Sequence, residues 1–205
     1  MIRVRSSAAV FLLTGFAAAQ QVPKSACDFD GFKIDSPLVQ VKAATTAYYA
    51  CATGKCLPMR LRPGDPAVIS RSEGDWTCGY FVAPGGAAQG WVPSNDLRPI
   101  LSDPNPPQTA FIGTWIQDSN SIRIRASKTS GSLELTGQAS WHGPRGSVNT
   151  GEVSAVAAPQ GNKLHLQDDA CTIDLALIGG FLLAHDNNMC GGANVRFWGI
   201  WKPVR

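Results

Sequence analysis

The sequence predicts an all-β protein made of two small units, a compact N-terminal β unit and a C-terminal antiparallel meander. Three observations predict this class. First, the 205 residues include 21 Gly and 14 Pro, about a sixth of the chain against a usual share of roughly an eighth, so turns are frequent. Second, short runs alternate apolar and polar residues, and none shows helical periodicity over about ten residues. Third, the charged fraction of 16% is too low for a disordered chain or a coiled coil.

Residues 1–19 are typical of a secretory signal peptide. A short basic start precedes the apolar run Ala8–Phe16 and the small residues Ala17–Ala19, which a signal peptidase accepts. We expect cleavage after Ala19 or Gln20. A membrane anchor would need about 20 apolar residues, and no stretch of that length follows. The protein is therefore expected to be periplasmic or extracellular, with no transmembrane segment.

Processing also changes the charge. The signal peptide carries two arginines and no acidic residue, so its removal lowers the formal net charge from +3 to +1. The densest basic pairs, Arg60/Arg62 and Arg123/Arg125, have the spacing of one strand face and are interpreted as solvated. Nucleic acid is not an expected partner, because a phosphate backbone calls for a basic stripe.

Six cysteines lie in the exported part, at Cys27, Cys51, Cys56, Cys78, Cys171 and Cys190. An even number in an oxidising compartment indicates disulfide bonds. If each unit pairs internally, Cys171 joins Cys190. Among the first four we expect a Cys51–Cys56 hairpin bridge and a Cys27–Cys78 bond, although the spacing leaves the other pairings open. We expect no metal, because the closest pair is separated by four residues and has no nearby histidine.

A Pro-rich stretch divides the chain. Pro99–Gln108 contains four prolines and cannot continue a sheet or a helix, so residues 101–109 are predicted as a linker. The units then span residues 20–100 and 110–205. In the first unit, β-like runs begin at Ala47, and Ser25–Thr46 is expected to be an N-terminal extension tied on by Cys27.

Part of the first unit resembles a bacterial SH3 domain. Arg60–Asp65, then Gly74–Tyr80, then the closing Gly90–Leu97 follow one another as a Gly-Asp turn, a Gly-Asp-Trp corner and a Gly-Trp-Val strand end. The match covers about residues 45–100. Tyr48–Cys51 departs from the Asn-Val-Arg that the family usually has at this point.

The SH3 resemblance implies a small barrel of five strands in an extracytoplasmic adaptor that sometimes grips peptidoglycan peptides. Its few core positions would be filled by Leu61, Val68, Trp91, Val92 and Leu97.

An aromatic platform is expected to bind the ligand, because Tyr and Trp combine rigid contact area with a polar tip. Its members would be Tyr48, Tyr49, Trp76 and Tyr80. The alternative is that Trp76 and Tyr80 are core or corner residues.

The second unit contains four clearly alternating runs, Ile122–Arg125, Ser132–Thr136, Lys163–Gln167 and Cys171–Leu175. Turn signals between them predict about eight antiparallel strands in sequence order, closed into a small barrel or a tight sandwich. The opening Gly113-Thr114-Trp115 and the closing Phe197–Lys202 resemble lipocalin-like and avidin-like barrels, whose first strand begins with Gly-x-Trp. A tryptophan buried in any β-sandwich is the alternative. At this size the interior is expected to hold side chains.

No enzyme motif or cofactor motif is present, and we expect a non-catalytic protein with no cofactor. The three histidines, His142, His165 and His185, lack a nearby free cysteine or serine elbow. Two functions fit. The first is a cell-envelope binding protein that recognises peptidoglycan or an envelope protein. The second is an inhibitor or immunity protein against a cell-wall hydrolase, similar to lysozyme inhibitors and acting through loops such as His142–Ser147 or Asp186–Asn188.

Overall fold

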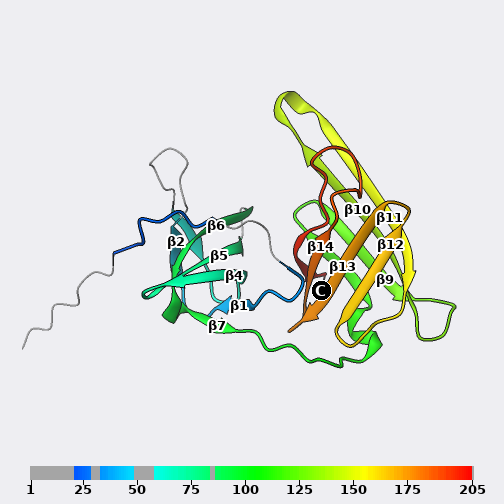
Figure 1. The fold of residues 1–205 in the computed structure, drawn as a ribbon, viewed down its shortest axis with the longest axis horizontal. Coiled ribbons are helices and arrows are strands. Elements are labelled where there is room, and N and C mark those ends of the chain that lie inside the picture. Colours follow the sequence, from blue (N-terminus) through cyan, green and yellow to red (C-terminus); the bar gives the residue numbers. More distant parts are fainter. Residues whose placement is uncertain (1–20, 29–32, 49–57, 84–85, 205) are drawn as a thin grey trace, which may run out of the picture.

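The computed structural model describes residues 21–28, 33–48, 58–83 and 86–204, so the predicted signal peptide, Tyr49, Cys51 and Cys56 lie outside the described residues. Within these ranges the protein is all β, as predicted, with two antiparallel sheets and three short 3-10 turns (Figure 1). None of the helical segments in the described ranges has the length and apolar character needed to cross a bilayer.

The N-terminal sheet has seven strands in the order β3-β2-β6-β5-β4-β1-β7. They are β1 (Leu38–Val41), β2 (Thr45–Tyr48), β3 (Pro58–Leu61), β4 (Pro66–Glu73), β5 (Trp76–Ala83), β6 (Gly86–Pro93) and β7 (Leu97–Pro99). The turn before β4 is closed by the Asp65 carboxylate, which accepts a hydrogen bond from the Arg62 amide at 2.8 Å. Gly64 in that turn has a φ of +97°, a conformation that favours glycine.

Two strands of this seven-stranded sheet, β1 and β7, were not predicted, since five strands were expected. Residues 25–46 were expected to be an extension, but Leu38–Val41 forms β1, which pairs with β4 on one side and with β7 on the other. A run of four residues, LVQV, is too short to show strand periodicity by itself. Its two partners are what make it a central strand.

The C-terminal sheet has eight strands, β8 (Gly113–Gln117), β9 (Asn120–Ala126), β10 (Leu133–His142), β11 (Val148–Ala157), β12 (Lys163–Asp168), β13 (Cys171–Ile178), β14 (Phe181–Asp186) and β15 (Gly199–Pro203). Each pairs with its sequence neighbour except β11 with β12, and β15 pairs with β8. The predicted eight-stranded meander is confirmed, and it is a nearly closed barrel. At the open seam, the Ser154 amide donates to Asp168 Oδ2 at 2.7 Å.

Apolar side chains fill the barrel. On β10, Leu133, Leu135, Gly137 and Ala139 are buried inward positions, while the residues that alternate with them, Glu134, Thr136 and Gln138, face solvent. The segment between β14 and β15 also contributes Val195 and Phe197 to this interior. A Cβ at Gly137 would lie 2.8 Å from Val153 Cγ1 and 2.9 Å from the Phe197 ring, so the ring needs a glycine there.

The two strands that close the barrel begin with the same five-residue pattern. Phe111–Trp115 and Phe197–Trp201 both read Phe-x-Gly-x-Trp. In each, the indole Nε1 donates to the carbonyl of the phenylalanine four residues earlier, at 3.0 and 3.1 Å. The glycines, Gly113 and Gly199, have φ values of +152° and +135°, which other residues rarely adopt. The same corner, closed by the same indole hydrogen bond, therefore occurs at the start of both strands.

Two disulfide bonds are present in the described residues. Cys27 is bonded to Cys78, and Cys171 to Cys190, which confirms both of these predicted pairs. The second bond ties the segment after β14 to the start of β13, and Cys190, Val195 and Phe197 of that segment belong to the barrel's core cluster. Closing a loop of this kind stabilises the fold by about 3 kcal/mol in the chain-entropy model.

The two sheets pack against each other through an apolar interface. Val68 from the N-terminal sheet joins Ala176 and Ile200 from the barrel in one buried cluster. Tyr80 adds its ring, which lies 5.6 Å from the ring of Trp198. Burial and, to a smaller extent, the charge of Asp118 raise the pKa of Tyr80 to about 12, and a hydrogen bond with Gln117 opposes part of the rise.

The five residues expected to form one SH3 core are divided by the structure. Leu61, Val92 and Leu97 share a cluster inside the N-terminal unit. Val68 faces the interface with the barrel, and Trp91 packs beside the Cys27–Cys78 bond. Strand alternation explains the division, because Trp91 and Val92 are adjacent and must face opposite sides.

Replacing Tyr80 with Phe tests the interface. The unfolded chain loses the Tyr80 proton near pH 10, and the folded chain near pH 12, so the wild type should lose about 2–3 kcal/mol of stability as pH rises through this window. The Tyr80→Phe protein keeps the aromatic ring but has no phenol proton to lose. Its free energy of unfolding should therefore not fall in this pH window for that reason. Urea unfolding at several pH values checks it, and parallel stability curves for the two proteins would refute the assignment.

Candidate functional site

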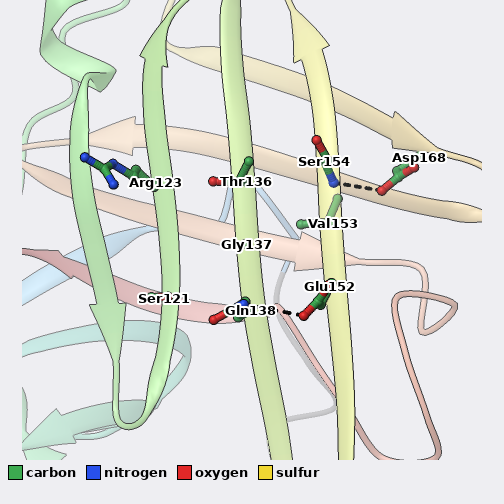
Figure 2. Close-up of a pocket in the computed structure, with 9 residues that line it drawn as sticks. All are labelled: Ser121, Arg123, Thr136, Gly137, Gln138, Glu152, Val153, Ser154 and Asp168. Carbon is green, nitrogen blue, oxygen red and sulfur yellow. Dashed lines mark hydrogen bonds between the residues drawn. The ribbon is translucent and has the colours of Figure 1, made fainter.

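An open groove of about 580 Å³ lies on the outer face of the barrel, over β9, β10, β11 and the end of β12 (Figure 2). Most of the residues that line it are polar, and they include both charges. The charged side chains are Arg123, Glu152 and Asp168, and the neutral polar ones are Ser121, Thr136, Gln138 and Ser154. A second hollow of about 330 Å³ continues from it along Gln138 and Glu152 toward Ser140 and Thr150.

The strand register arranges these side chains in two rows across the sheet. In the first row, Thr136 pairs with Arg123 on one side and with Ser154 on the other. In the second row, Gln138 pairs with Ser121 and with Glu152. All six alternate with buried residues, and so they project from the same face.

Some groups in the groove are already engaged. Gln138 Nε2 donates to Glu152 Oε1 at 3.4 Å, and Asp168 accepts the Ser154 amide (Figure 2). Arg123 differs. Within the described residues its guanidinium makes no hydrogen bond and no ion pair. The groove therefore presents one unpaired cation near carboxylates that lie on other strands.

A second candidate is the hairpin of β10 and β11, which extends beyond the barrel (Figure 1). Its tip, His142–Ser147, is closed by a hydrogen bond from the Gly143 amide to the Ser147 carbonyl at 2.8 Å. Trp141 packs against the barrel core below it. The segment after β14 braces the hairpin, since the Gly192 amide donates to the Thr150 carbonyl at 3.0 Å.

Of the aromatic residues proposed from the sequence, Trp76 and Tyr80 do not share one exposed surface. Trp76 is 7% exposed and packs with Trp91 and the Cys27–Cys78 bond. Tyr80 lies against Trp198 at the interface between the sheets. Tyr48 ends β2 in register with Trp91, and Tyr49 lies outside the described residues. Trp76 and Tyr80 thus occupy the core positions that the sequence left as the alternative.

Residues 22–27, which we name the strap, cover Trp76 and Trp91. Trp91 Nε1 donates to the Ser25 carbonyl at 3.0 Å, and Arg71 donates to the Ala26 carbonyl. The strap is fixed further by the Cys27–Cys78 bond. This side of the N-terminal unit is consequently filled by the chain itself.

The histidines do not converge on one centre. His165 and Asp174 face each other across β12 and β13, with Nδ1 and Oδ1 2.7 Å apart, and both are exposed. His142 is at the hairpin tip, where Nε2 lies 3.4 Å from Ser140 Oγ. His185 is exposed on β14. No group of three or more His, Cys, Asp or Glu side chains in the described ranges is placed to hold a metal.

The second loop proposed from the sequence, Asp186–Asn188, begins with a residue that stabilises the fold. Asp186 is 3% exposed and accepts a hydrogen bond from the Phe197 amide at 2.6 Å. Asn187 and Asn188 follow it in an exposed turn. The hairpin tip is therefore the more accessible of the two loops.

Comparison with protein-family models and with curated proteins finds no match for this chain. The groove and the hairpin are therefore the features on which a function can be based. Most residues of the groove were not singled out in the sequence, where Arg123 was interpreted as part of a solvated strand face. Alternation places Arg123 on the outer face, but only the barrel brings Glu152 and Asp168 beside that face.

Replacing Trp76 with Ala distinguishes a core residue from a binding residue. Removal of this buried indole should lower the free energy of unfolding by about 3–5 kcal/mol. Val156→Ala is the control, because Val156 is 57% exposed and the change there should stay within about 0.5 kcal/mol. Urea denaturation followed by circular dichroism measures both, and equal stabilities would show that Trp76 is not part of the core.

Proposed function

We propose that this chain is a secreted, non-catalytic binding protein of the cell envelope that recognises peptidoglycan or a protein partner. The signal-like start of the sequence supports secretion. The two disulfide bonds agree with it, because such bonds form and persist in oxidising compartments. All four cysteines of the described residues are in these bonds, so none of them is available as a thiolate nucleophile.

The proposal includes an SH3-like unit at about residues 45–100. Its support comes from the end of the unit, where Gly90-Trp91-Val92 lies in β6, the short turn Ser94–Asp96 follows, and Leu97 begins β7. This is the order that the sequence resemblance requires. The strap and the barrel cover two faces of the unit, so it serves in this proposal mainly as a partner for the barrel.

The groove on the barrel carries the proposal. Glycan strands and their peptides present closely spaced hydroxyl, amide and carboxylate groups along an extended chain. A groove that offers hydroxyls, an amide and both charges in two rows can hydrogen-bond such a polymer at several points. The groove is open and continues into the second hollow, which suits a chain that passes through rather than a small enclosed ligand.

Sedimentation with purified peptidoglycan tests the proposal. The wild type should sediment with the polymer, and Gln138→Ala combined with Glu152→Ala should bind about tenfold more weakly, because both exposed side chains line both hollows. His165→Ala, on the outer face of β12, is the matched control and should bind normally. The proposal fails for peptidoglycan if the wild type stays in the supernatant.

The hairpin favours the second function, an inhibitor of a cell-wall hydrolase. A tip that protrudes from a rigid barrel and is braced from behind can enter a substrate cleft with little loss of conformational entropy. In that case the exposed tip residues His142–Ser147 would make the contact, and the groove would be unnecessary.

An assay of hydrolase turnover separates the two functions. If the hairpin inhibits, the protein should abolish clearing of a peptidoglycan suspension by a muramidase, and Arg145→Ala should weaken that inhibition at least tenfold. Arg125→Ala, an exposed arginine away from the tip, should change nothing. Full hydrolase activity in the presence of excess wild-type protein would exclude inhibition of that enzyme.

A further inference from the structure

Arg123 is the feature of the groove that the fold itself leaves unused. It is exposed on β9, and its guanidinium has neither a hydrogen bond nor an ion pair within the described ranges. Thr136 lies directly opposite on β10, and Ser121 lies two residues away on the same strand face. An arginine with free donors between two hydroxyls is well arranged to bind a planar carboxylate through paired hydrogen bonds.

The opposite side of the groove has the opposite charge. Glu152 on β11 lies two strands from Arg123 and in the neighbouring row. With strands about 4.8 Å apart and about 3.4 Å per residue, the two main-chain positions are on the order of 12 Å apart. Asp168 adds a second carboxylate at the far edge. A ligand that fills the groove therefore meets a cation at one end and anions at the other.

This charge distribution discriminates between ligand classes. A polyanion such as nucleic acid or an anionic lipid surface would be attracted by Arg123 but repelled by Glu152 and Asp168. A neutral glycan would leave the guanidinium without its best partner. A short chain with a free carboxylate and a free ammonium group satisfies both ends at once.

We propose, on the basis of the proposed function, that the groove binds the peptide part of peptidoglycan as a dipolar ligand. Its carboxylate pairs with Arg123, with hydrogen bonds from Thr136 and Ser121, and its ammonium group pairs with Glu152. Gln138 lies between the two ends and supplies an amide for the peptide backbone.

Titration calorimetry with a soluble disaccharide-peptide released from peptidoglycan by a muramidase tests this inference. Arg123→Gln should weaken binding at least tenfold. Arg125→Gln is the matched control, because Arg125 is exposed on the same face of the same strand but does not line the groove. It should bind like the wild type, and both variants should have the wild-type unfolding temperature.

Chemical modification of the ligand identifies the groups that are recognised. Amidation of the peptide carboxylates should weaken binding to the wild type about as much as Arg123→Gln does, and the two changes together should cost little more than either one. Acetylation of the ammonium group should weaken binding about as much as Glu152→Gln does, and these two changes together should also cost little more than either one. Glu134→Gln, an outward carboxylate of β10 outside the groove, is the control for the second pair.

The outcomes separate this inference from the function on which it rests. If the wild type sediments with peptidoglycan but binds free and amidated fragments equally, the dipolar site is overturned and the binding function stands. The same holds if Arg123→Gln and Arg125→Gln bind equally well. If the wild type binds neither the polymer nor the fragment, both proposals fall.

Discussion

The pairing of β15 with β8 is the constraint on which the rest of the structure depends. These are the last and the first strand of the meander, and their pairing turns an open sheet into a nearly closed barrel. Each begins at the same Phe-x-Gly-x-Trp corner, whose buried tryptophan is 4% exposed at Trp115 and fully buried at Trp201. Burying an aromatic side chain of this size contributes about 1.5–3 kcal/mol or more, so the corner supplies local hydrogen bonding and much of the apolar surface that holds the closure.

Closure then decides which surfaces remain for binding. Because the interior is filled with aliphatic and aromatic side chains, the candidate binding surfaces are the outer face and the extended hairpin. The interface with the N-terminal sheet covers the barrel near Ala176 and Ile200, and the strap covers Trp76 and Trp91 on the other unit. The groove over β9, β10 and β11 is left uncovered, and its polar rows are the direct result of strand alternation on a barrel whose inner positions are mostly apolar.

Much of the fold could be predicted from local pattern. Ile122–Arg125 and Lys163–Gln167 alternate strictly, and both became strands with their apolar residues inside. Cys171 and Cys190 lie in one unit and are bonded as expected. Leu38–Val41 was missed because four residues carry no readable period, and it became a strand only through β4 and β7. Leu61, Val68, Trp91, Val92 and Leu97 are buried or half-buried as expected, but Val68 and Trp91 are covered by the barrel and by the strap, which are distant in the sequence.

The sequence by itself determined the all-β class and the strand order of the meander, because period-two alternation and turn residues are local properties of the chain. It indicated the Cys171–Cys190 bond but left the partner of Cys27 open, which the fold decided. Only the tertiary structure decided which polar residues meet. Arg123, Thr136 and Ser154 lie on three strands, and their register brings them into one row. It also decided that Trp76 is buried and Tyr80 half-buried, because burial depends on what packs against a strand, and here the covering segments come from elsewhere in the chain.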